Sequence, residues 1–172
     1  MAIIFKNFKI KVLNAGPIFL LYYLSISEID TQFSNLYEIL SFNLQLIIIY
    51  YWMLRDEEIL GTGHIFFAGI INDVVTGLPL GISSILYLVG AFIALYIKNL
   101  TVNISLFTDW FTFLIAIFFS NVVFLTLMLN FSNFTVIYSD IFYNAFFTFL
   151  FFPFFWFIFN LYKNLMRIRN DD

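Results

Sequence analysis

The sequence contains little charge and no cysteine. Only 11% of its 172 residues are charged and 62% are hydrophobic, whereas soluble domains hold about 25% charged residues. Without cysteine, disulfides and thiolate metal sites are excluded. The single histidine, His64, has no partner at metal-ligand spacing, and the net charge of -3 leaves no basic stripe for nucleic acid. We therefore expect an integral membrane protein with no cofactor, no metal and no nucleic-acid partner.

Residue patterns for enzymatic chemistry are missing as well. The sequence offers no paired acids and no glycine-rich phosphate loop with its lysine. A serine, a histidine and an aspartate cannot be brought together on one side of a membrane from these positions. We expect a protein that is not an enzyme.

Long apolar runs are what the sequence has in abundance. A membrane-spanning helix needs about 20 mostly apolar residues, and short polar joints divide the chain into six such runs. We predict a single all-α domain over residues 1–172, a six-helix transmembrane bundle, with a kink or a short interfacial helix at Gly16-Pro17. The predicted spans are 11–27, 34–54, 59–76, 80–98, 108–130 and 139–162.

Basic residues fall on only one side of this predicted bundle. The three opposite joints contain none. Because positively charged residues collect in cytoplasmic loops, we expect both termini in the cytoplasm. The basic residues on that side are Lys6, Lys9, Lys11, Arg55, Lys98, Lys163, Arg167 and Arg169.

The third predicted span has one small or polar face and one bulky face. At about 100° per residue, Gly69, Asn72 and Asp73 share the first face, and phenylalanine and valine occupy the second. The next span carries a matching face that includes Ser84, and the joint at 77–81 has the glycine and proline content of a tight turn. This pattern predicts a close antiparallel hairpin at the outer surface.

Asp73 is an ionisable residue within an apolar helix. On insertion scales such a residue costs roughly 2.5–3.5 kcal/mol at the bilayer centre, so it usually faces protein or water. We favour a hydrogen-bonded clamp of the turn, made with Asn72 and the hydroxyl groups of Thr76 or Ser83. A ligand or proton site, and exposure at the lipid interface, are the alternatives.

This region contains several short motifs in a fixed order. They are Tyr51-Trp52, Gly61-Thr62-Gly63, the G-x-x-x-D-x-x-x-G spacing of Gly69, Asp73 and Gly77, and Leu80-Gly81. In this order and spacing they resemble the rod shape-determining protein MreD family of bacteria. The resemblance covers residues 50–98, and Asn144 and Pro153 also look similar to the family. The candidate structural or interaction residues are Gly61, Gly63, Gly69, Asn72, Asp73, Gly77, Pro79 and Gly81.

The resemblance implies a non-enzymatic scaffold of the elongation (rod) complex in the bacterial inner membrane. Such a scaffold takes part in cell shape maintenance and lateral peptidoglycan synthesis. The implied partners are an MreC-like bitopic membrane protein, the MreB filament system, the polymerase RodA and a class B penicillin-binding protein, beside membrane lipids. The implied fold looks like that of the six-helix substrate-binding subunits of energy-coupling factor transporters.

That likeness leaves a second hypothesis, a substrate-binding membrane subunit of a vitamin transporter, with Asp73, Asn72 and Tyr87 in its pocket. A ligand pocket gathers several convergent polar groups. The other polar residues of the outer half, among them Glu38, Asn121 and Asn144, look scattered along the sequence. We therefore favour the scaffold.

The remaining polar residues are assigned to helix ends and membrane surfaces. Asp109 suits the first turn of the fifth span, Arg55 lies in a cytoplasmic joint, and His64 is an interfacial or packing residue. The basic tail from Lys163 to Arg169 is expected to attract anionic lipid, and contact with a filament is the alternative.

Overall fold

The computed structural model describes residues 15–27, 43–100, 105–131 and 138–171, the last five of these as backbone alone. All regular elements in these ranges are α-helices, which confirms the predicted all-α class. They are α2 (Gly16–Ile26), α4 (Leu44–Arg55), α5 (Glu57–Leu60), α6 (Thr62–Thr76), α7 (Ile82–Leu100), α8 (Leu106–Phe131) and α9 (Tyr138–Asp171).

Three of these helices are long and apolar enough to cross a membrane. They are α7, α8 and the Tyr138–Met166 part of α9. The helices α2 and α4 are apolar but shorter, and residues 11–14 and 34–42 of the first two predicted spans lie outside the described residues. The protein therefore has the helices of a membrane protein, and its last three predicted spans coincide with them.

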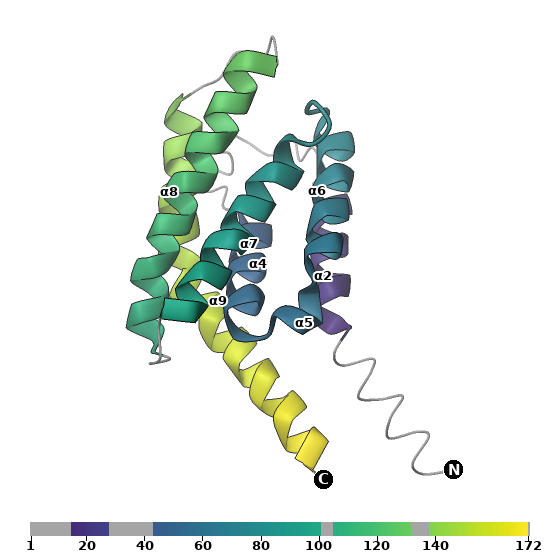
Figure 1. The fold of residues 1–172 in the computed structure, drawn as a ribbon, viewed down its shortest axis with the longest axis vertical. Coiled ribbons are helices and arrows are strands. Elements are labelled where there is room, and N and C mark those ends of the chain that lie inside the picture. The colour runs from purple at the N-terminus through teal and green to yellow at the C-terminus, as the bar shows by residue number, and fades with distance from the viewer. Residues whose placement is uncertain (1–14, 28–42, 101–104, 132–137, 172) are drawn as a thin grey trace, which may run out of the picture.

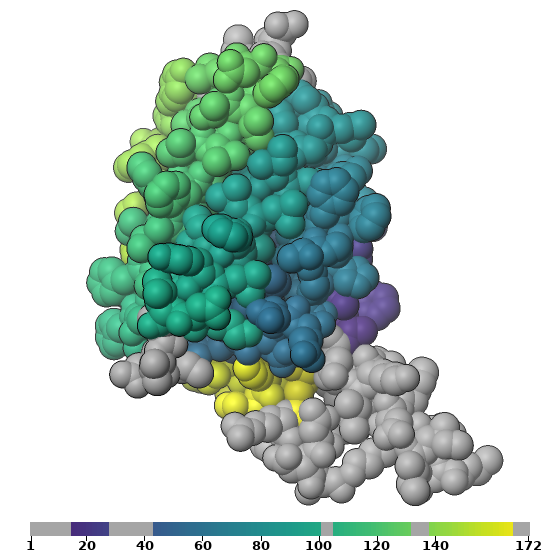
Figure 2. Space-filling view, in the orientation of Figure 1, coloured from purple at the N-terminus to yellow at the C-terminus, as the bar shows by residue number. Residues whose placement is uncertain are grey.

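Helix α4 lies at the centre of the arrangement. All ten residues from Gln45 to Leu54 are buried, as expected for a helix that is apolar around its whole circumference. In Figure 1, α7 crosses in front of α4, with α2 and α6 on one side and α8 and α9 on the other. Figure 2 shows α7 between α8 and α6 on this face of the molecule.

Aromatic rings join α4 to α8 and α9. Tyr50 and Phe113 have ring centroids 4.8 Å apart, and Phe113 stacks on Phe152 at 4.4 Å. All three side chains are fully buried, and the Tyr50 hydroxyl donates to Thr112 Oγ1 at 2.8 Å. Contacts of this kind contribute about 0.5–1.5 kcal/mol per ring pair beyond the buried area.

Pro153 lies inside α9. A proline within a helix has no N–H to donate to the carbonyl four residues before it, which here belongs to Phe149. The indole Nε1 of Trp110 donates to that carbonyl at 2.9 Å, and the Trp110 and Phe149 rings stack. A side chain of α8 therefore replaces the backbone hydrogen bond that Pro153 removes from α9, which is how neighbouring helices make proline tolerable in an apolar environment.

Two of the predicted spans differ from the helices observed at the same positions. The third span, 59–76, is not one helix, because Gly61 has a φ of 63° and separates α5 from α6; glycine adopts this conformation without a steric penalty. The 15 residues of α6 reach about 22 Å, less than the thickness of about 30 Å of a hydrocarbon core. The last predicted span, 139–162, lies within α9, which continues to Asp171 and projects beyond the other helices (Figure 1).

The bundle has two chemically different ends. One, the basic end, contains Arg55, Lys98 and Lys163: the Lys98 ammonium pairs with Glu57 at 3.2 Å, and the Lys163 ammonium donates to the Arg55 carbonyl at 3.1 Å. The other, the turn end, contains the joint 77–81 between α6 and α7. These three basic residues therefore share one end, in agreement with the charge pattern of the sequence.

The predicted hairpin of α6 and α7 is present, and its two helices approach closely. A Cβ atom added to Gly69 would lie 2.4 Å from the Cα atom of Ser84. The Ser84 hydroxyl donates to the Phe66 carbonyl at 2.9 Å. On the opposite face of α6, Phe67 and Val74 are exposed, so the division into a small face and a bulky face is confirmed.

Replacement of Gly69 by alanine should destabilise the hairpin. The added methyl group meets backbone atoms of α7, and overpacking of this kind typically costs about 1–3 kcal/mol. The measurement is the thermal unfolding midpoint in detergent. Gly63→Ala is the matched control, because a Cβ atom there meets no atom within 4 Å. Equal midpoints for the two variants would contradict the close approach.

Candidate functional site

Asp73 is fully buried near the end of α6 and binds the start of α7. Its Oδ2 accepts a hydrogen bond from the Gly81 N–H at 2.6 Å, and its Oδ1 accepts one from the Ser83 N–H at 2.9 Å. The Ser83 amide belongs to the first turn of α7 and the Gly81 amide directly precedes that helix. Amides at this position have no partner within the helix, and the helix dipole favours negative charge beside them. The carboxylate is therefore a clamp on the N-terminus of α7. Its partners are backbone amides rather than the expected hydroxyl groups.

Asn72 extends the clamp to the central helix. Its Oδ1 accepts from Gln45 Nε2 of α4 at 2.9 Å, and its Nδ2 donates to the Ser83 hydroxyl at 3.2 Å. The Thr76 hydroxyl donates to the Asn72 carbonyl at 2.8 Å. Asn72 and Asp73 together connect α4, α6 and α7 through polar groups that are shielded from solvent.

The turn between α6 and α7 depends on two glycines. Gly77 ends α6 with a left-handed φ of 72°, and the next amide, of Leu78, donates to the Asp73 carbonyl at 2.9 Å, which is a Schellman-type helix end. Gly81 has a φ of 99° and presents its N–H to the clamp. Pro79 accepts from the Ile82 N–H at 3.3 Å.

The other two candidate glycines differ from each other. Gly61 has the positive φ that separates α5 from α6. Gly63 lies in the first turn of α6, and a Cβ atom there would meet nothing within 4 Å, so nothing in the structure explains glycine at this position. His64 is exposed, and its Nδ1 lies 3.1 Å from the Tyr22 hydroxyl of α2, a contact between two helices rather than a catalytic arrangement.

A cavity of about 300 Å³ lies beside the clamp. Residues of α6, α7, α8 and α9 line it, together with Leu78 of the joint after α6 and Asn43, the residue that caps the start of α4. The prediction that the polar residues of this half are scattered is therefore wrong for Asn121 and Asn144. Glu38 lies outside the described residues. The lining residues are Asn43, Asn72, Thr76, Leu78, Ser83, Leu86, Tyr87, Asn121, Phe124, Asp140, Ile141 and Asn144.

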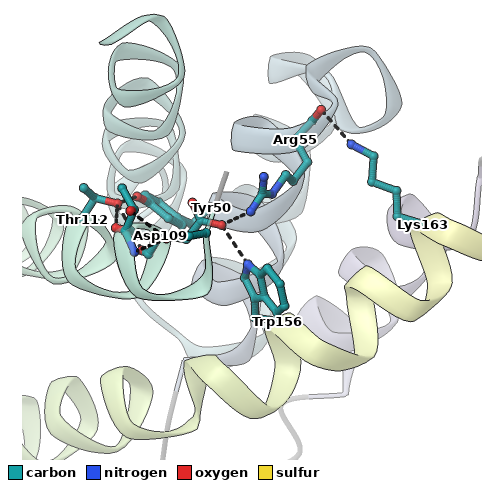
Figure 3. Close-up of polar contacts among 8 residues, drawn as sticks. Tyr50, Arg55, Asp109, Thr112, Trp156 and Lys163 are labelled. Carbon is teal, nitrogen blue, oxygen red and sulfur yellow. Dashed lines mark hydrogen bonds and ion pairs between the residues drawn. The ribbon is translucent and has the colours of Figure 1, made fainter. Parts of the chain in front are cut away.

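A buried ion pair lies at the basic end (Figure 3). The Arg55 guanidinium, at the end of α4, pairs with the Asp109 carboxylate in the first turn of α8, and both side chains are about 5% exposed (5% and 6%). The Trp156 indole of α9 donates to the same carboxylate oxygen at 2.8 Å. The Arg55 guanidinium carbon also lies 5.8 Å from the Trp156 ring centroid, within cation–π range. Three helices therefore meet at one carboxylate.

The sequence does not predict this pair. Its pattern places Arg55 in a cytoplasmic joint and Asp109 at the start of the fifth span, with no contact between them. The signal that could have found it is a single basic residue at the end of an otherwise apolar run, with a single acid at the start of a later one. Burial of two charges of opposite sign costs less free energy when they pair than when each is buried alone.

Neither end has the geometry of a catalytic or metal centre among the described side chains. Both Asp73 oxygens accept backbone hydrogen bonds, and Asp109 is paired with a cation and an indole. Within the same residues, no three metal-binding side chains come together. Comparison of the chain with protein-family models, curated proteins and solved structures found no match.

The clamp predicts a loss of stability in Asp73→Leu. Removal of the carboxylate leaves two buried amides without an acceptor, and hydrogen bonds to charged groups contribute about 1.5–3 kcal/mol each. Folded yield in detergent and the unfolding midpoint should both fall. Asp140→Leu is the control, since this carboxylate is exposed at the same end. An Asp73→Leu protein as stable as the control would count against the clamp.

The ion pair predicts non-additive losses of stability. Arg55→Met or Asp109→Leu alone leaves an unpaired buried charge, which typically costs about 3–5 kcal/mol, and the double variant should lose less than the sum of the two. Free energies of unfolding from the four proteins of this cycle give the coupling. The exposed pair Lys98–Glu57 is the control and should couple by about 1 kcal/mol or less. Additive losses at Arg55 and Asp109 would refute the pairing.

Proposed function

We propose that the protein is a non-enzymatic membrane scaffold similar to MreD, which joins the proteins of the elongation complex in the bacterial inner membrane. In this proposal the chain crosses the membrane six times, with both termini in the cytoplasm. The supporting observation is that Gly69, Asp73, Gly77 and Gly81, which carry the resemblance, build one structural unit, the α6–α7 hairpin. A motif with a structural role fits a scaffold better than an enzyme.

The polar residues also favour a scaffold. In the described part of the chain, the two fully or nearly buried acids, Asp73 and Asp109, are engaged by amides, an arginine and an indole. A general acid or base must reach a substrate proton, whereas these groups connect helices to one another. Their arrangement supports a rigid bundle that keeps its outer faces in a constant position.

The outer faces offer apolar contact surface for other membrane segments. Phe118 of α8 and Phe142, Phe154 and Phe157 of α9 are each more than half exposed. In a bilayer, such faces contact lipid or the transmembrane helices of partners, and helix association there depends on close packing. The proposed partners each have transmembrane helices that such faces could contact. They are an MreC-like bitopic protein, RodA and a class B penicillin-binding protein.

The cavity at the turn end favours one second candidate, the substrate-binding subunit of a small-molecule transporter. Asn121, Asn144 and Tyr87 line the cavity with Asn72, and convergent polar groups in a cavity of about 300–1,000 Å³ are typical of ligand sites. In contrast with the original hypothesis, Asp73 would not bind the substrate, because both of its oxygens are used by the hairpin.

The two functions differ in the proteins that the chain binds. A tagged full-length chain, isolated from gently solubilised native membranes, should retain an MreC-like protein and the cell-wall synthases in mass spectrometry of the eluate. A tagged, unrelated multi-pass protein from the same membranes is the control. Recovery of an ATPase pair with a coupling membrane subunit instead would overturn the scaffold and establish the transporter.

A further inference from the structure

The polar cavity at the turn end adjoins an apolar groove between α8 and α9. The groove has a volume of about 440 Å³. Asn121 of α8 and Ile141 of α9 line both spaces. A polar space and an apolar space that share lining residues match a molecule with a polar head and an apolar chain.

The groove has the chemistry of a site for a hydrocarbon chain. Its lining is apolar apart from Asn121 and Tyr138, and side chains such as Phe118, Val122, Phe142 and Phe146 leave large parts of their surface exposed. Both helices belong to the three that are long and apolar enough to cross a membrane. A chain in this groove would therefore come directly from the bilayer.

The cavity has the chemistry of a site for hydroxyl or amide groups. The Asn121 amide makes one hydrogen bond in the described part of the chain, from Nδ2 to the Ile117 carbonyl at 2.9 Å. Its Oδ1 and its second N–H are therefore available to a ligand, because an amide side chain carries two donors and one acceptor. The exposed Asp140 carboxylate adds an acceptor to the same lining.

Charge excludes an anionic head. The cavity lining contains no lysine or arginine and includes the Asp140 carboxylate. The sequence places every basic residue before position 12, at 55, at 98, or after 162, and Arg55, Lys98 and Lys163 all lie at the basic end. A phosphate or carboxylate in the cavity would be desolvated without a cation, which is strongly unfavourable.

We propose that the cavity and the groove form one lipid-binding site, with an uncharged headgroup that bears hydroxyl or amide groups in the cavity and an acyl chain in the groove. This site is separate from the proposed scaffold function. A partner's transmembrane helix fits the cavity less well, because its backbone groups are bonded within the helix and cannot pair with the Asn121 amide.

Native mass spectrometry of the full-length protein tests this site with three lipids of equal chain length. These are monoglucosyl diacylglycerol, phosphatidylethanolamine and phosphatidylglycerol. The glycolipid should bind most tightly and phosphatidylglycerol least, by about fivefold or more. The phosphate of phosphatidylglycerol would be desolvated without a cation, and a loss equal to one net hydrogen bond of about 1 kcal/mol already gives about fivefold.

Two variants distinguish binding of the lipid headgroup in the cavity from binding of the acyl chain in the groove. Val122→Trp fills the groove and should reduce the occupancy of all three lipids severalfold, whereas Asn121→Leu should abolish the preference for the glycolipid and leave overall binding in place. Val74→Trp, on the exposed face of α6, and Thr126→Leu, on an exposed position of α8, are the matched controls and should bind as the parent protein does.

Three results would overturn the proposal. The first is equal binding of phosphatidylglycerol and the glycolipid. The second is an effect of Val122→Trp no larger than that of Val74→Trp. The third is a photo-crosslinker at Phe142 that captures a polypeptide in native membranes and no lipid, which would make the groove a protein interface. None of these results depends on which proteins co-purify with the chain, so the scaffold is tested separately.

Discussion

The carboxylate of Asp73 fixes how α7 begins, and much of the remaining packing follows from that position. Its two bonds to the amides of Gly81 and Ser83 set the register of α6 against α7. In this register Gly69 contacts the backbone at Ser84. Further along α7, a Cβ atom on Gly90 would lie 2.6 Å from a methyl carbon of Leu46, so at that point the same helix packs against a side chain of α4. A shift of α7 would disturb both contacts.

Polar contacts secure both ends of α4, the central helix, and one of them is the buried pair of Arg55 and Asp109. At the turn end, Gln45 at the start of α4 is bonded to Asn72; at the basic end, Arg55 at the end of α4 is paired with Asp109. Between them, the residues of α4 are apolar or aromatic and buried. In an apolar environment polar groups that lack partners are strongly unfavourable, so the two ends specify which helices α4 can contact, and the apolar middle supplies most of the burial.

The sequence predicted those features that depend on local pattern. Periodicity placed Asn72 and Asp73 on the packed face of α6, and the glycines at 77 and 81 indicated the turn. The pairing of Arg55 with Asp109 joins positions 54 residues apart, and the cavity gathers residues of four helices and the capping residue of a fifth; neither has a local signature. The break at Gly61 was missed because glycine in an apolar run fits both a helix and an interruption.

These features together describe a bundle with a rigid interior and apolar outer faces. Buried polar groups connect helices, and aromatic side chains cover the outside of α8 and α9. Such a molecule suits a role that depends on shape and contact, whether its neighbours are protein helices or lipid.

Amide hydrogen exchange at Gly81 and Ser83 is the most direct measurement of the Asp73 clamp. It can be made residue by residue, by nuclear magnetic resonance on the protein in lipid nanodiscs, and compared with Asp73→Leu. The clamp predicts slow exchange of both amides in the parent protein and selective loss of that protection in the variant, with α8 unchanged. Fast exchange of both amides in the parent protein, or equal protection in the two proteins, would contradict it.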